Sequence, residues 1–436
     1  MDRSGPAHLG VIEKTAEFTM RKFWWSSLLI LLLRQGVHAQ GKSPLTWEQV
    51  RERFETNNPT LLAGRLNIDE SKAEEITAYL RPNPTLTMVV DQIDPFSGGP
   101  EHGPFAYLLT TANVNYLHER RHKRELRLES AQQGTMIASS QQADLERTLL
   151  FNLRGAFVET LQAKAVVEVA KANLDYYDHV LSVSREQYKA GDIAQIDLDR
   201  LELQRVQFEA DLENAEVSLR TSKIQLLELL NDRSPVEQFD VVGPFDFNEQ
   251  LQSLDEYRKT ALDARPDLRA AAEAVAKAQT DHKLAVANGS TDPFLGFDVG
   301  RNPPIDAYIG VSVNIPLRIF DRNQGEKLRT KLDIDRNQQL RSAVEAQVFG
   351  DVDSAFATLN STLVLLRPYK AKYLEQAVKV RDTVYFSYQH GGASLLDFLN
   401  AQSQYRSVQL SYVNLVGSYL AAASQLNLAV GREVIQ

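Results

Sequence analysis

One stretch of the chain is written twice, and this repeat constrains the fold more than any other feature. Tyr188 and Gly191 recur 200 residues further on as Tyr388 and Gly391. Self-similarity at a fixed offset indicates that one structural unit occurs twice. The sequence therefore predicts an internal two-fold repeat. The register holds without a gap through these matched pairs: Gln204 and Gln404, Asn214 and Asn414, Ser218 and Ser418, Leu226 and Leu426.

The two halves also open in the same way. Residues 45–80 and 254–286 both read as helices, and a proline interrupts each near its first third, Pro59 in one and Pro266 in the other. Proline is a strong local break in a helical pattern. We therefore divide the chain after residue 39 into a first repeat at 40–231, a non-helical linker at 232–253 and a second repeat at 254–436.

Residues 1–39 have the pattern of an extension followed by a secretory signal peptide. Two basic residues precede an apolar run at 23–33, and a group of small residues ends at Ala39. The apolar run has 11 residues, which is too short to span a bilayer. We expect cleavage near Ala39. Residues before Met20 carry no targeting pattern, so we prefer Met20 to Met1 as the start.

Composition excludes several classes of protein. The formal net charge is −9 and no basic stripe is present, which argues against nucleic-acid binding, because phosphates require positive charge. The chain has no cysteine, so it has no disulfide and no lipid anchor on an N-terminal cysteine. Leu, Ala, Gln, Glu and Arg dominate the sequence, as in long helices.

After each opening helix the apolar period changes from 3.6 to 2, which predicts two β-hairpins, at 84–116 and 293–316. Each strand has an apolar face and a small or polar face, as transmembrane β-strands require. Four strands cannot close a barrel, and open edges are not tolerated in lipid. If the strands cross a membrane, several chains must contribute to one barrel. The four predicted strands are 84–92, 106–116, 293–300 and 306–316.

The rest of each half is predicted to be a long helical hairpin, at 118–231 and at 322–430. The first helix of each has about 65 to 70 residues and would reach roughly 100 Å at about 1.5 Å per residue. Pro368 is expected to bend the second long helix or to begin a local rearrangement. Each hairpin reverses at a glycine-bearing tip.

This order of elements, written twice behind a signal peptide, resembles the TolC family of outer-membrane efflux proteins. The resemblance covers residues 45–431 and is carried by the two Tyr-x-x-Gly tips, by residues 395–402 after the second tip, and by Ile315-Pro316-Leu317 leading into 320–325. The run at 320–325 is similar to the CzcC-like branch, which serves heavy-metal exporters.

The resemblance implies a mainly helical fold with a membrane β-barrel. Three chains would each give four strands to a 12-stranded barrel in the lipid of the outer membrane, and their helical hairpins would form a periplasmic α-barrel. The homotrimer would be a passive efflux duct without cofactor or catalytic residues. Its expected partners are a periplasmic adaptor protein and an inner-membrane pump of the RND type.

The resemblance also assigns roles to residues near the tips. Acidic residues just past the second tip form the periplasmic gate in this family. The matching positions are Asp397 and Asn400, of which Asn400 departs from the acidic pattern, and Asp197 is the equivalent of Asp397 in the first half. Asp397 also suits a helix N-terminus in any protein, and Asp197 has Arg200 nearby for a local ion pair. The tip residues expected to contact the adaptor are Gly191, Asp192, Gly391 and Gly392.

Three other functions are considered. His118-Glu119-Arg120-Arg121-His122 matches the zinc-protease pattern H-E-x-x-H, but the adjacent arginines would oppose a dication. A structural coiled-coil protein would explain the helices and not the strands. The exit duct of a type I protein secretion system would use the same fold.

Overall fold

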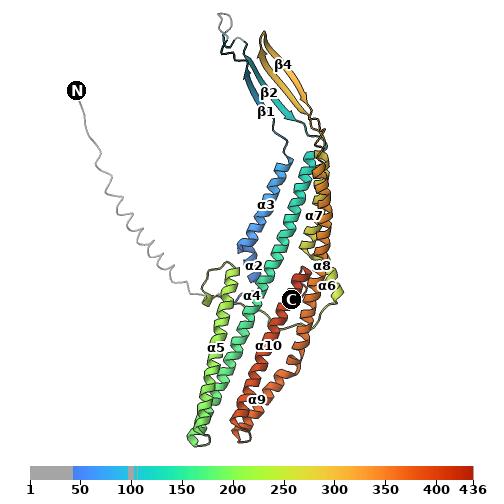
Figure 1. Cartoon of the computed structure of the whole chain (residues 1–436). Helices are drawn as coiled ribbons and strands as arrows, with labels where there is room; N and C mark the ends of the chain where they lie inside the picture. The colour runs from blue at the N-terminus through green and yellow to red at the C-terminus, as the bar shows by residue number, and fades with distance from the viewer. Residues whose placement is uncertain (1–42, 97–102, 106, 436) are drawn as a thin grey trace, which may run out of the picture.

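The computed structural model describes residues 43–96, 103–105 and 107–435 of the chain. The predicted signal peptide lies outside these residues. The molecule is a long rod with a β-sheet at one end and two helical tips at the other, as Figure 1 shows. Among the described residues, no helix is both long enough and apolar enough to cross a membrane.

Each half opens with two consecutive helices rather than one. These are α2 (Trp47–Asn57) with α3 (Pro59–Tyr79), and α6 (Leu254–Ala264) with α7 (Pro266–Asn288). The breaks fall at the predicted prolines because each proline starts a new helix, a position where its missing N–H costs nothing. At the first break, the side chain of Asn58 accepts hydrogen bonds from the backbone N–H groups of Thr60 and Leu61, and donates one to the carbonyl of Leu229.

Five helices form two hairpins that run towards the tips. α4 (Lys123–Ala190) and α5 (Gln195–Leu229) form the first hairpin, and α8 (Gln324–Pro368), α9 (Leu374–Gln389) and α10 (Leu395–Val430) form the second. Between α8 and α9 the chain makes a five-residue π-helix, Tyr369–Tyr373. The predicted rearrangement at Pro368 is confirmed, and proline's missing N–H explains why it begins there.

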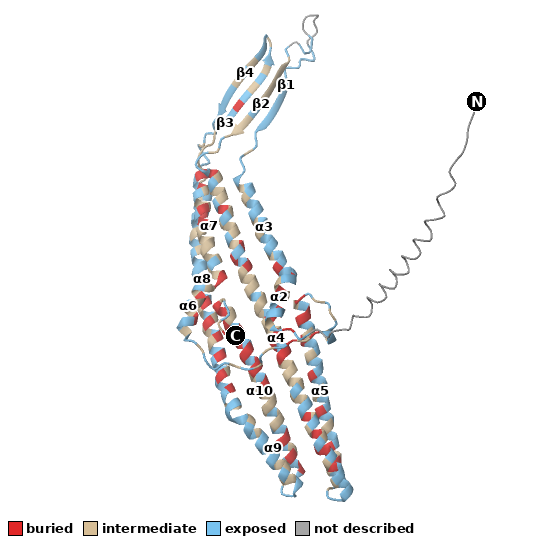
Figure 2. Ribbon diagram, turned by 180° about the vertical axis from the view of Figure 1, so that it is seen from behind, coloured by how far each residue is buried: buried red, intermediate tan, exposed pale blue. Residues whose placement is uncertain are grey.

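The helices lie side by side, with α4 in the middle. α4 packs against α3 and α7 in the sheet-proximal part and against α5 and α10 in the tip-proximal part, while α8 packs against α7 and α10. Buried apolar residues form separate clusters along this length; buried positions are red in Figure 2. The flanks of the chain are therefore α3 and α5 on one side and α8 and α9 on the other.

The linker packs against the middle of the rod. It contains a short 3₁₀ helix, η1 (Val236–Gln238), and Val241 makes a parallel bridge with Leu45. Asp240 binds both Lys164 of α4 and Lys223 of α5, at 2.8 and 3.1 Å. These two lysines lower the pKa of the Asp240 carboxyl against the opposing effect of burial.

The strands are β1 (Thr85–Asp91), β2 (Leu109–Leu117), β3 (Phe294–Asn302) and β4 (Ile305–Asn314), in an antiparallel sheet of order β1-β2-β3-β4. The two hairpins expected from the sequence are present, and β2 also pairs with β3. The strand predicted at 106–116 begins later, at Leu109; Ala106 lies outside the described residues.

The register gives the sheet one continuous apolar face. Leu86 lies opposite Val114, Val114 opposite Phe297, and Phe297 opposite Val311. Val311 is 85% exposed. The other face carries mostly small or polar residues, including Asn113, Gly296, Asp298 and Ser312, and Thr111 is hydrogen-bonded to Tyr308 across it.

Asn58→Ala is predicted to lower the thermal unfolding midpoint of the purified protein. The change removes two caps of α3 and the link to the end of α5, and such losses cost about 1–3 kcal/mol. The matched control is Asn57→Ala, because Asn57 is exposed and makes no side-chain hydrogen bond with the described residues. Equal midpoints for the two variants would contradict the assignment.

Candidate functional site

The two tips have the same backbone geometry. Gly191 has φ 85° and Gly391 has φ 75°, both in the left-handed region. The N–H of Gly191 donates to Tyr188 and that of Asp192 to Gln187, while Gly391 donates to Tyr388 and Gly392 to Ser387. These bonds satisfy the last carbonyls of each helix, and glycine is favoured there because it lacks a Cβ.

Gly391 and Gly392 differ in what they require. A Cβ at Gly391 would meet nothing within 4 Å, but its positive φ disfavours any other residue. Gly392 has no positive φ, and a Cβ there would lie 3.5 Å from the Ser387 carbonyl oxygen, an ordinary contact. The backbone conformation therefore requires a glycine at position 391 and not at position 392.

Asp397 caps the N-terminus of α10. Its carboxylate accepts hydrogen bonds from the Ser394 hydroxyl at 2.7 Å and from the Ser394 N–H at 3.0 Å, and its own N–H donates to the hydroxyl. These bonds lower the pKa of the Asp397 carboxyl. The side chain remains exposed, so it holds a charge at the surface of the tip.

Of the other predicted gate residues, Asn400 is exposed and Asp197 is half-buried. Asn400 is one helical turn beyond Asp397, on the same side of α10. Asp197 is on α5, at the other tip, and lies 3.8 Å from Arg200, as its expected local ion pair requires. Burial raises the pKa of the Tyr388 hydroxyl, and the charge of Asp197 adds to this effect.

An aromatic cluster behind the tips holds the two hairpins together. Tyr388 stacks on Phe398 with ring centres 5.6 Å apart and planes 13° apart. Tyr177 and Phe208 of the first hairpin belong to the same buried cluster as Phe398. The tips are therefore exposed ends on a shared apolar base.

Arg381 was not identified from the sequence. Its guanidinium lies over the rings of Tyr176 of α4 and Tyr405 of α10, 4.5 and 4.2 Å from their centres. Burial raises the pKa of Tyr176 to about 12. Arg381 thus joins three helices through cation–π contacts. No short-range motif marks it, because its partners are more than 20 residues away and only the helix packing brings them together.

The zinc-protease hypothesis is wrong. The two histidines do not share one helical turn. His118 and Glu119 lie before α4, and His122, the residue directly before α4, has a left-handed φ of 55°. Glu119 pairs with Arg127 at 2.5 Å. No group of three or more metal-ligating side chains occurs in the described part of the chain.

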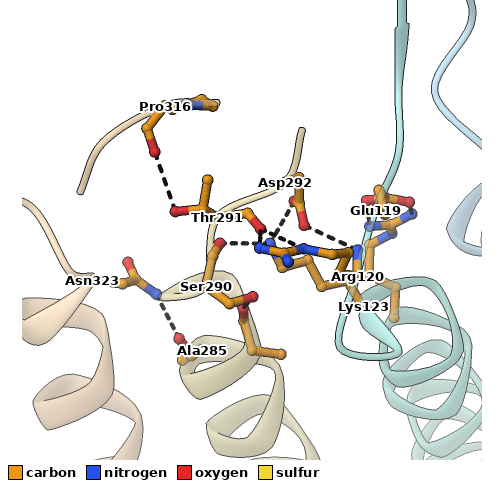
Figure 3. A network of polar contacts seen from close by, with 11 residues as sticks. Glu119, Arg120, Lys123, Ala285, Ser290, Thr291, Asp292, Pro316 and Asn323 are labelled. Carbon is orange, nitrogen blue, oxygen red and sulfur yellow. Dashed lines mark hydrogen bonds and ion pairs between the residues drawn. The ribbon is translucent and has the colours of Figure 1, made fainter. Parts of the chain in front are cut away.

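This segment instead fastens the sheet to the helices. As Figure 3 shows, Arg120 and Lys123 converge on the loop before β3. The Arg120 N–H donates to Asp292 at 3.0 Å, and the Lys123 ammonium pairs with Asp292 and donates to the carbonyl of Ser290. Lys123 is 4% exposed. Arg120 and Lys123, the basic residues that argued against a zinc site, thus connect this segment to the loop before β3.

No family model matches the chain. It is 23% identical over 407 residues to the cobalt-zinc-cadmium resistance protein CzcC of Cupriavidus metallidurans, covering 90% of this chain and 91% of that one. It is 25% identical over 323 residues to the pyoverdine export outer membrane protein OpmQ of Pseudomonas aeruginosa, covering 71% of this chain and 66% of that one.

Solved structures show the same fold. The CusC channel superposes with a TM-score of 0.73 at 17% identity, covering 88% of this chain and 92% of that one. The MtrE outer membrane channel of Neisseria gonorrhoeae gives 0.71 at 18% identity, with 89% of each chain covered. These relatives and structural neighbours are outer-membrane channels of the TolC family, the family that the sequence resembles. These homologues are outer-membrane channels of efflux systems, which are not enzymes.

Gly391→Ala is predicted to loosen the second tip. A left-handed alanine costs about 1–2 kcal/mol, so amides of residues 387–398 should exchange with deuterium faster than in the unchanged protein. Gly392→Ala is the control and should leave exchange unchanged, because it needs no left-handed backbone. Equal exchange in both variants would refute the distinct role of Gly391.

Proposed function

We propose that the chain is the outer-membrane duct of a tripartite efflux system, working as a homotrimer. The observation that carries this proposal is the sheet. It has one continuous apolar face, one mainly polar face, and free edges at β1 and β4. A four-stranded sheet of this kind cannot stand alone in lipid, because unpaired edge groups cost several kcal/mol each.

Pairing between chains removes both edges. β4 of one chain would pair with β1 of the next, and three chains would close a 12-stranded barrel with the apolar face towards lipid. The internal repeat fits this arrangement, since each half gives one hairpin to the barrel and one to the helical tube. The flanking helices α3 with α5 and α8 with α9 would meet in the same way.

The tips are the proposed contacts with a periplasmic adaptor and, through it, an inner-membrane RND-type pump. Gly191, Asp192, Gly391 and Gly392 are at the end of the rod farthest from the sheet (Figure 1). In a periplasm-spanning assembly this end faces the inner membrane. A type I secretion duct would use the same end, but no feature of the described residues favours that alternative.

Divalent heavy-metal ions are the proposed cargo. The relative named for cobalt, zinc and cadmium resistance matches nearly the whole chain, and the run at 320–325 points to the same branch. Three copies of Asp397 at the neck of the tube would attract cations. Asp397, Asn400 and Asp197 are accordingly the proposed gate residues.

The purified protein is expected to form trimers that conduct ions across a planar lipid bilayer. Because the tube is proposed to be closed at the tips, conductance should rise when the gate is opened by mutation. An absence of trimers together with an absence of conductance, in the unchanged protein and in gate variants, would overturn the proposal.

Met88→Asp is predicted to reduce the amount of protein assembled in the outer membrane. Met88 is 74% exposed on the apolar face, and an ionised side chain facing lipid costs up to a few kcal/mol. Its neighbour Thr87 lies on the polar face, so Thr87→Asp is the matched control and should assemble normally. Outer-membrane fractionation measures both. Equal loss in the two variants would contradict the proposed orientation.

Asp397→Asn is predicted to lower the cation-over-anion permeability ratio of the channel at neutral pH, and Asn400→Asp to raise it. Asp192→Asn removes a tip charge outside the proposed gate and serves as control. The Ser394 hydrogen bonds hold the pKa of Asp397 low, so its charge persists at neutral pH and is lost only as pH falls through that lowered pKa. A ratio independent of Asp397 would exclude it from the gate.

A further inference from the structure

A pocket midway along the rod lies outside everything assigned above. It has a volume of about 510 Å³ and is lined by α2, α4, the first residue of α7, the end of α10 and residues 431–433. This volume is in the range of small-molecule sites. Since the pocket lies against α4 and α10, in the middle of the chain rather than on its flanks, the proposed trimer would leave it open.

Arginine side chains gather in this pocket. Arg51, Arg147, Arg154 and Arg432 line it, with Glu146 and Glu433 as the acidic members. Arg51 is paired with Glu55 at 2.6 Å, and Arg147 with Asp144 and the Leu428 carbonyl. With these two pairs set aside, Arg154 and Arg432 are balanced by Glu146 and Glu433, so the pocket has no general excess of positive charge.

Arg154 differs from Arg51 and Arg147, which are already paired. Its guanidinium lies over the ring of Trp47, 4.4 Å from the centre, and it makes no hydrogen bond or ion pair with any described residue. Burial lowers the pKa of Arg154, and the charges of Glu433 and Glu48 offset this only in part. A half-buried guanidinium without an acceptor is costly, so an anion beside it would be stabilising.

The far wall is held in place by a specific set of hydrogen bonds. The side-chain oxygen of Asn427 accepts from the N–H groups of Val434 and Ile435, at 2.8 and 3.0 Å, and its amide donates to the Ile435 carbonyl at 2.7 Å. Gly431, with φ 87°, lets the chain turn there. These contacts fix Arg432 and Glu433 at the rim, so the pocket is a formed structure.

We propose that this pocket binds a small organic carboxylate with an apolar body. The face of the Arg154 guanidinium is covered by Trp47, which leaves its N–H edge for the two oxygens of a carboxylate, a geometry that arginine matches with two parallel hydrogen bonds. Leu150, Phe151 and Pro266 supply apolar surface for the rest of the ligand.

Trp47 provides a direct readout. The chain has three tryptophans, at positions 24, 25 and 47, and the expected cleavage near Ala39 removes the first two, so Trp47 is the tryptophan that reports on the pocket in the processed protein. The probe is para-nitrobenzoate, an aromatic carboxylate that quenches tryptophan fluorescence, and para-nitrobenzamide is its uncharged counterpart. Saturable quenching by the carboxylate, with weaker quenching by the amide, is the expected result.

Two pocket variants and one control complete the test. Arg154→Gln should weaken binding of para-nitrobenzoate by about tenfold or more, as loss of a charged hydrogen-bonding partner does. Arg432→Gln, at an exposed position that does not support folding, should weaken it several-fold by the same argument. Arg185→Gln, whose partner Glu202 lies near the tips, should bind normally.

Non-saturable quenching, equal quenching by the amide, or binding unchanged in both pocket variants would overturn the proposal. Failure of this site would leave trimer formation and conductance unaffected, so it is distinguishable from failure of the duct.

Discussion

The pairing of β2 with β3 is the interaction on which the rest of the structure depends. Residues 110–117 of the first half pair with residues 294–301 of the second, and this joins two hairpins that would otherwise be separate. The register brings apolar residues of both halves onto one face. It also leaves β1 and β4 as the free edges of the sheet. Everything proposed about membrane insertion and chain number follows from one apolar face with two open edges.

The helical part of the chain also depends on contacts between the two halves. α4 lies between the other helices and binds the two halves along their length, and the Arg120–Asp292 and Lys123–Asp292 contacts connect this body to the sheet. At the opposite end the halves share an aromatic base that includes Tyr177 and Phe398. The chain is thus fastened at the sheet, along the middle and at the tips.

Much of the fold was predictable because it depends on local patterns. Alternating apolar residues indicated all four strands, and Pro59, Pro266 and Pro368 marked breaks that the structure confirms. The ends of the strands were predicted less accurately, as at Leu109, because a strand ends where its partner strand stops pairing with it. The β2–β3 pairing was not predicted, since no turn joins these strands.

The site was predictable only where the backbone demands a residue type. Gly191 and Gly391 are marked by their positive φ angles, and Asp397 by its place in a helix first turn. Arg381 and Arg154 were missed because each is defined by aromatic rings distant in sequence. The H-E-x-x-H match was already disfavoured by its arginines, and the structure adds a second reason: its spacing has meaning only on a continuous helix, whereas the chain here turns at Arg121 and His122. The roles of Asp397, Asn400 and Asp197 as a gate remain proposals.

The similarity of the two tips ends at their first helical turns. Both reverse through a left-handed glycine, yet Asp397 is held by Ser394 in a capping box whereas Asp197 faces Arg200. A capped and a locally paired carboxylate differ in how much charge they present to a passing ion. This difference makes the second tip the better candidate for the gate.

Cysteine cross-linking between sheet edges tests the central claim most directly. The chain has no cysteine, so one can be placed at Val89 of β1 and a second moved along residues 306–313 of β4. Within a chain these strands are about 14 Å apart, three strand spacings, beyond the reach of a disulfide. The account predicts a disulfide between chains at one register, giving a covalent ladder that ends at the trimer. No cross-link at any register, or a ladder that continues past the trimer, would contradict it.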